Sequence, residues 1–257
     1  MFLTRAFEII NKEGVLTFRY ALGQKMRENM TDEKIYQLYI KNVEPRQNVI
    51  SENQCVQVVS VKENNTVKQV MEAVEKVSTE YVVLCSSDYE LCEDYEKKVS
   101  HYILIQKKAG RNLKYIYSDS DCKPDYSWNT LLSFNYIGNV FAVKRQFFLH
   151  RMNEFVDNFG SDSKFDSYKT SLFLLSDNSA ENVGHIHQIL AHKKADYKEE
   201  SDISEYKCLL PELKNKNVCV VTDKHNKNVQ HIHYPLSEND CVSIIIPSKD
   251  NPEILKV

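Results

Sequence analysis

Histidine and cysteine are the residue types in this chain whose chemistry depends most on spacing. The seven cysteines form no CxxC pair, so the sequence predicts buried free thiols in a reducing compartment rather than a zinc ribbon or a redox site. Because side chains alternate between the faces of a strand, we expect His185 and His187 to point to opposite faces and to be poor joint metal ligands. No carboxylate or thiol near His231 and His233 suggests a metal, so structural roles are expected there.

Glycine-rich nucleotide-binding motifs are missing from the sequence. It contains six glycines, of which no two form GxGxxG and none precedes a Lys-Ser/Thr pair. A Rossmann fingerprint and a P-loop are therefore excluded, and any nucleotide must be held by another device. The formal net charge of −3 gives no electrostatic footprint for nucleic acid, which is not expected as a partner.

Strand-like and helical patterns alternate along the middle of the chain. Apolar runs at 56–61, 81–85 and 114–118 enclose helical patterns at 67–77 and 93–108. This β-α-β-α-β order is typical of an α/β sheet with right-handed crossovers. Further elements are predicted as strands at 137–143, 183–190, 218–222 and 229–234 and as a helix at 168–175.

Residues 1–50 are predicted to form a helical arm, because Leu3, Phe7 and Ile10 recur at helical spacing. Packing on a partner domain and peripheral contact with a membrane both remain open, since Arg and Lys alternate with Phe and Leu over residues 2–28. No apolar run reaches the roughly 18 to 20 residues of a membrane span, and the N-terminus lacks the apolar region of a signal peptide. The sequence indicates a cytoplasmic protein, with the inner face of the membrane as an alternative.

Three segments resemble the family-2 glycosyltransferases, in particular bacterial two-domain enzymes of polysaccharide biosynthesis. The longest match joins residues 117–121 (YSDSD) to residues 123–137 (KPDYSWNTLLSFNYI), and the others are 185–194 (HIHQILAHKK) and 242–251 (VSIIIPSKDN). The resemblance implies an α/β, GT-A-like, mostly parallel sheet. The first nucleotide-binding β-α-β portion of the family's domain is missing, so a reduced domain is expected.

The resemblance also divides the chain into four parts. After the helical arm at 1–50, residues 51–204 would form the reduced GT-A-like domain. Residues 205–240 would form a linker subdomain, and residues 241–257 would be the truncated start of a second glycosyltransferase domain.

Catalytic and metal-binding roles follow only from the resemblance. In the family, two carboxylates after a buried strand hold a divalent cation against the donor's diphosphate. Here Asp88 keeps one such position and His192 matches a histidine that reaches the metal, so a weakly bound magnesium or manganese ion is the implied cofactor. The position of the catalytic base falls on Ser167, and Asp166 or Asp162 would replace it through a register shift. The alternatives are a polar strand end or helix cap at Asp88, a surface or structural role for His192, and loop or helix-cap roles for the other two carboxylates.

Donor and acceptor contacts are implied in the same way. For Trp128, which the resemblance assigns to the acceptor, packing is the alternative role. The implied donor-binding residues are Asp119, Asp121, Ser248 and Asp250, and the implied acceptor-binding residues are Trp128 and Asn135.

The implied reaction transfers a sugar from a nucleotide-sugar donor to a glycan or lipid-linked acceptor in cell-surface polysaccharide biosynthesis. The alternative is a non-catalytic, degenerate scaffold or acceptor-binding module that keeps the fold. The eroded metal motif and the missing donor portion favour the alternative for this segment. The nucleotide-sugar and the glycan acceptor are the expected partners, through the full-length protein.

Overall fold

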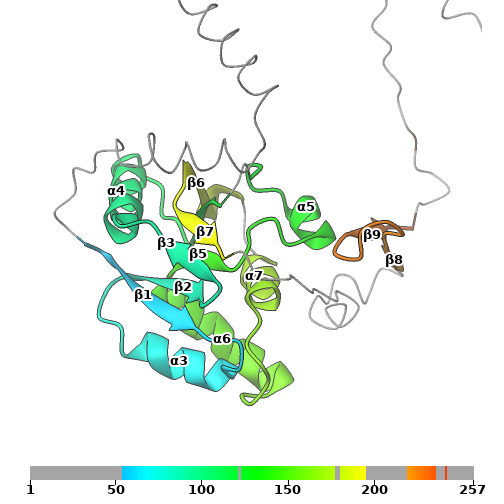
Figure 1. The fold of residues 1–257 in the computed structure, drawn as a ribbon, viewed down its shortest axis with the longest axis horizontal. Coiled ribbons are helices and arrows are strands. Elements are labelled where there is room, and N and C mark those ends of the chain that lie inside the picture. The colour runs from blue at the N-terminus through cyan, green and yellow to red at the C-terminus, as the bar shows by residue number, and fades with distance from the viewer. Residues whose placement is uncertain (1–53, 121–122, 177–179, 195–218, 236–240, 242–257) are drawn as a thin grey trace, which may run out of the picture.

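The computed structural model describes residues 54–120, 123–176, 180–194 and 219–235, together with Cys241 (Figure 1). The predicted helical arm, and the segment expected to begin a second domain apart from Cys241, lie outside the described residues. Most of the predicted linker subdomain lies outside them as well, except residues 219–235.

A five-stranded sheet of order β1-β2-β5-β4-β6 forms the centre of the molecule. Strands β1 (Val56–Val61), β2 (Tyr81–Ser86), β4 (Tyr115–Asp119) and β6 (Val183–Ile189) run in one direction, whereas β5 (Val140–Lys144) is antiparallel to both of its neighbours. The predicted α/β class with a mostly parallel sheet is confirmed. Residues that follow β1, β2 and β4 are therefore brought to one edge of the sheet.

Helices cover both faces of this sheet. Helices α3 (Val67–Glu75), α6 (Arg145–Phe159) and α7 (Ser167–Leu175) share one apolar core with it, and α4 (Tyr95–Lys108) packs in a second core on the opposite face (Figure 1). Helix α5 (Trp128–Ser133) and a short 3-10 helix (Ala180–Asn182) complete the helical elements of the described residues.

The alternation of side chains along β2 shows how the sequence specifies this two-sided burial. Val82 and Leu84 belong to the core with α3 and α6, whereas Tyr81, Val83 and Cys85 belong to the core with α4. Because both faces are covered, the strand is a continuous apolar run rather than an alternating one.

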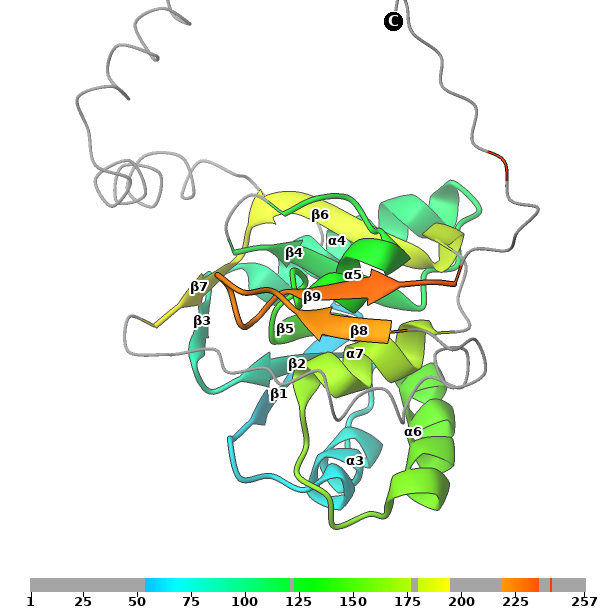
Figure 2. The ribbon, with the colours of Figure 1, turned by 90° about the vertical axis from the view of Figure 1, so that its right-hand side faces the viewer.

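Two small sheets extend the domain. Strand β3 (Tyr89–Leu91) pairs antiparallel with β7 (Ala191–Lys193), next to the carboxyl end of β2. Strands β8 (Cys219–Thr222) and β9 (Gln230–His233) form a hairpin that lies beside α5 (Figure 2).

Most predicted elements are confirmed within a few residues, but α5, α6, β3 and β7 were not predicted. In addition, the sequence does not predict the antiparallel direction of β5, because an apolar strand has the same residue pattern in a parallel and in an antiparallel pairing. Among the described residues, no helix has the length and apolar character needed to cross a bilayer.

Candidate functional site

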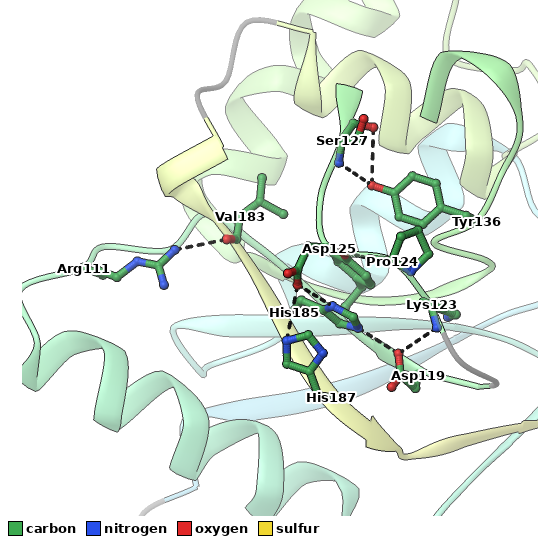
Figure 3. Close-up of polar contacts among 11 residues, drawn as sticks. Arg111, Asp119, Lys123, Pro124, Asp125, Ser127, Tyr136, Val183, His185 and His187 are labelled. Carbon is green, nitrogen blue, oxygen red and sulfur yellow. Dashed lines mark hydrogen bonds and ion pairs between the residues drawn. The ribbon is translucent and has the colours of Figure 1, made fainter. Parts of the chain in front are cut away.

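A cluster of two aspartates and two histidines lies where β4 and β6 end side by side (Figure 3). Asp119 is the last residue of β4, while His185 and His187 belong to β6. The register between these strands shifts after Ser118, so that Asp119 pairs with Ile189. Such irregularities are typical of sites where strands re-aim side chains, and here the Asp119 carboxylate contacts His185, with a ligand atom of His187 within 4.8 Å.

His185 lies between two carboxylates. Its Nε2 is 2.7 Å from Asp119 Oδ1, and its Nδ1 is 3.1 Å from Asp125 Oδ1. The side chains of His185 and Asp119 are only 5% and 13% exposed, so this pair is largely screened from water. The Asp125 carboxylate is 81% exposed and forms the outer wall of the cluster. Donation to both carboxylates requires a proton on each ring nitrogen.

The second histidine completes the cluster from the solvent side. His187 Nε2 is 3.3 Å from Asp125 Oδ1, and the side chain is 67% exposed. The His185 and His187 rings lie 4.0 Å apart between their centroids. Our expectation that they point to opposite faces was therefore wrong. Residues two apart on a strand share a face, and this spacing in the sequence was the signal that identifies the pair.

Tyr117 holds the buried histidine in place. Its ring stacks on the His185 ring at 4.4 Å between centroids, and its hydroxyl donates to Pro124 O at 2.8 Å. Burial is the largest cause that raises the pKa of Tyr117 well above its ordinary value, and the neighbouring Tyr136 is the next largest. The Asp125 and Asp119 carboxylates raise this pKa further. The phenol therefore remains a neutral donor at physiological pH.

Lys123 ties the loop after β4 to the sheet. Its backbone N donates to Asp119 Oδ1 at 3.3 Å, and its Nζ donates to Ser118 O and Ile137 O at 2.9 and 2.7 Å. These contacts bring the segment that carries Asp125 back over β6. Neither Lys123 nor Asp125 was assigned a role from the sequence, since their approach to His185 depends on how this loop returns.

Asp88 and His192, the predicted metal ligands, lie on adjoining segments. Asp88 immediately precedes β3 and His192 is in β7, where it pairs with Glu90. Asp88 Oδ2 accepts from the Ser86 hydroxyl at 2.9 Å, and Asp88 O accepts from Lys194 N.

This setting suits magnesium or manganese poorly. Asp88 is a single carboxylate, and the ammonium of Lys194 donates to Ser87 O beside it at 2.7 Å. Hard divalent cations need several oxygen ligands, and a neighbouring ammonium repels them. The metal role of Asp88 and His192 stays a prediction, and no step of a mechanism is derived through it.

The two candidate bases lie in the connection between α6 and α7. Asp166 is the N-cap of α7, where its Oδ1 accepts from Lys169 N at 2.8 Å. Asp162 is exposed, and its carboxylate contacts the Ser161 hydroxyl at 3.4 Å. This connection also packs on the start of α3, since Ser161 O and Ser163 O accept from the first backbone amides of that helix. These contacts give Asp166 a structural role as a helix cap. None of them joins Asp166 or Asp162 to the histidine cluster.

The predicted donor and acceptor residues are dispersed. Asp119 is in the cluster, whereas Asp121, Ser248 and Asp250 lie outside the described residues. Trp128 begins α5 and packs against the core as a partly buried side chain. Asn135 shapes the turn before β5, because its Oδ1 accepts from Gly138 N at 3.0 Å.

A further histidine–aspartate pair lies in the β8–β9 hairpin. His231 Nε2 is 2.8 Å from Asp223 Oδ2, so a carboxylate is near after all, contrary to the sequence-based expectation. The His231 hydrogen bond and those from His225 N and Asn226 N lower the pKa of Asp223 to about 2. One histidine and one carboxylate are too few ligands for a metal site, so the pair is consistent with the structural role predicted for His231.

No protein-family model matches the chain, and no curated protein gives a significant match. Among solved structures, the chain is similar to the crystal structure of glucosyl-3-phosphoglycerate synthase from Mycobacterium tuberculosis in complex with Mn2+, UDP-glucose and phosphoglyceric acid. The identity is 11% and the TM-score 0.31, over 66% of this chain and 62% of that one. The chain thus spans less than two thirds of that structure's length.

Proposed function

We propose that this chain is part of a GT-A-like glycosyltransferase that moves a sugar from a nucleotide-sugar donor to a glycan or lipid-linked acceptor in cell-surface polysaccharide biosynthesis. The proposal starts from the resemblance of residues 117–137 and 185–194 to family-2 glycosyltransferases. An α/β domain with a mostly parallel sheet is a suitable scaffold, because such sheets bind ligands beyond the carboxyl ends of their strands.

One observation carries the proposal. The two segments that resemble the family converge in a single network, since His185 contacts Asp119 and Asp125, 66 and 60 positions away in sequence. Asp119 was assigned to the donor from the resemblance alone. Its place at the carboxyl end of β4, partly open to solvent, is suited to accepting hydrogen bonds from ribose or sugar hydroxyls.

A second candidate function is a non-catalytic module that keeps the fold and binds the glycan acceptor. The use of Asp166 as a helix cap and the setting of Asp88 beside Lys194 favour it. In this interpretation, the chemistry of the parent protein would reside in another domain. The partly buried ring of Trp128 would then be a candidate surface for stacking on a sugar.

Calorimetry with the full chain separates the two functions. UDP- and dTDP-sugars with manganese would be titrated into the wild type, Asp119→Asn and Asp157→Asn, an exposed carboxylate on α6 that serves as the control. Micromolar binding that is weakened at least about tenfold only by Asp119→Asn supports the transferase.

A second titration uses glycan oligosaccharides in place of the nucleotide-sugar. Saturable oligosaccharide binding with no nucleotide-sugar binding supports the acceptor module. Binding of neither ligand class would contradict both functions.

A further inference from the structure

We propose that Asp119, His185 and His187 form a binding site for a divalent transition-metal ion of the zinc type. One potential ligand atom from each of the three residues lies within 4.8 Å of the other two. Figure 3 shows His185 directed toward Asp119, and His187 beside it directed toward Asp125. This site shares Asp119 with the donor contact of the proposed function, but it is tested with the metal ion alone, and it uses other residues than the predicted Asp88 and His192 pair.

The spacing of the cluster is close to that of a metal centre. Zinc–ligand bonds of about 2.0 to 2.2 Å separate neighbouring ligand atoms by roughly 3 to 3.4 Å. The distance of 2.7 Å from Asp119 Oδ1 to His185 Nε2 is a hydrogen bond, which would lengthen by roughly half an ångström around an ion. The third ligand atom, on His187, lies within 4.8 Å of the other two, and the exposed ring has room to move toward them.

The donor set selects the type of metal. Two imidazoles and one carboxylate are ligands that suit zinc, cobalt and nickel, whereas magnesium and calcium favour sites built from oxygen. Three protein ligands leave room for water in a tetrahedral or five-coordinate arrangement. The site would therefore be an open one rather than a closed structural centre.

The surroundings of His185 resemble the outer contacts of metal-bound histidines. A ligating imidazole commonly donates its other N–H to a carboxylate, which fixes the tautomer and the ring orientation. Asp125 Oδ1 lies 3.1 Å from Nδ1, and Tyr117 stacks on the ring. In this arrangement Asp125 is a positioning residue, while Nε2 is left to bind the ion beside Asp119.

Access and charge also favour an ion at this point. The side chains of His187 and Asp125 are 67% and 81% exposed and give a path from solvent. The carboxylates of Asp119 and Asp125 supply negative charge around a largely buried imidazole, against the single positive charge of Lys123, whose Nζ donates to Ser118 O. The backbone of Lys123 holds Asp119 in place. Asp119 and His185 are therefore positioned before an ion arrives, which lowers the cost of binding.

The test is a cobalt titration of the full chain, prepared without an affinity tag. Visible absorption reports coordination, and zinc competition with calorimetry gives the stoichiometry. We expect one equivalent bound without a thiolate-to-cobalt charge-transfer band. His187→Ala and Asp119→Asn should each raise the dissociation constant at least about tenfold, whereas His150→Ala, an exposed histidine on α6, should leave it unchanged.

Asp125→Asn sharpens the assignment of roles. It should weaken binding while the cobalt spectrum keeps its shape, since Asp125 orients a ligand and is not one. Because His187 is exposed, His187→Ala is expected to fold, and circular dichroism checks this. No binding by the wild type, binding equal in His187→Ala, or a spectrum dominated by thiolate charge transfer would overturn the proposal.

Discussion

Two aspartates follow buried strands at the same edge of the sheet, yet their surroundings differ. Asp88, after β2, contacts the Ser86 hydroxyl and lies beside Lys194. Asp119, at the end of β4, contacts the imidazole of His185 and the backbone of Lys123. The resemblance to glycosyltransferases assigns a role to both positions, but only the second gathers side chains that can act together.

The difference lies in what the polar groups around each carboxylate do. After β2 they mostly connect backbone: Ser86 N donates to Asn139 O, Ser87 N to Val61 O, and Lys194 N to Asp88 O. After β4 the main contacts join side chains of two segments distant in sequence. The turn after β2 is thus held mainly by backbone hydrogen bonds, whereas the end of β4 brings together side chains from two distant segments.

The largest expected effect tests whether the two regions fold as one unit. Phe141 in β5 is fully buried between them and stacks on Tyr115 at 4.8 Å. Phe141→Ala should lower the free energy of unfolding by about 3 to 5 kcal/mol through lost burial and a cavity. Hydrogen exchange measured at increasing urea concentrations should show the backbone amides of β2 and β6 losing protection together. Separate transitions for the two strands would show that the regions are independent.

A smaller loss of stability is expected from a substitution in β6, the strand that carries His185 and His187. A Cβ on Gly184 would meet Leu113 Cδ1 at 2.6 Å and Tyr102 Cε1 at 2.9 Å. Gly184→Ala should therefore cost about 1 to 3 kcal/mol by overpacking and shift the NMR signals of His185 more than those of Asp88. The control is Gly110→Ala, where no atom lies within 4 Å but φ is +79°, so only backbone strain contributes. An unperturbed His185 in Gly184→Ala would contradict the packing described here.

Removal of the Asp119 carboxylate should destabilise the protein more than removal of the Asp88 carboxylate. With chelator present, Asp119→Ala should cost about 1 to 3 kcal/mol, because it leaves buried His185 without one partner. Asp88→Ala should cost no more than about 1 kcal/mol, since its hydrogen bond to Ser86 is partly exposed. Thermal unfolding of the two variants measures the difference. The reverse order would place the more important carboxylate after β2.

The smallest effect is a pH dependence at the end of β2. Burial raises the pKa of the Cys85 thiol from 9.0 to about 11, and the Lys194 charge only partly opposes this. Between these values the folded state keeps a proton that the unfolded state releases, so Cys85 makes stability fall as the pH rises from about 9 to 11. Denaturant midpoints over this range should fall less steeply for Cys85→Ala than for the wild type. Equal slopes would show that the thiol is not buried as described.

The sequence predicted the scaffold better than the site. Continuous apolar runs such as residues 81–85 identify buried strands on their own, because both faces must be covered. Helix α6 was missed although Phe148, Met152 and Phe155 are buried at helical spacing. The strand direction of β5 depends on tertiary pairing, which no local pattern encodes.

The site was predicted only in part for a similar reason. Asp119 was identified through the resemblance, and His185 with His187 could have been recognised as neighbours from their spacing of two. The approach of Asp125 depends on the loop after β4, which Lys123 ties to Ser118 and Ile137. Such contacts between distant segments follow from the completed fold and not from local sequence.

The most direct test of the difference between the two aspartates is crystallographic. Crystals of the full chain soaked in cobalt would be measured on both sides of the cobalt absorption edge. We expect an anomalous peak bounded by Asp119, His185 and His187, and none beside Asp88. A peak between Asp88 and His192, or no peak at either position at full cobalt exposure, would contradict it.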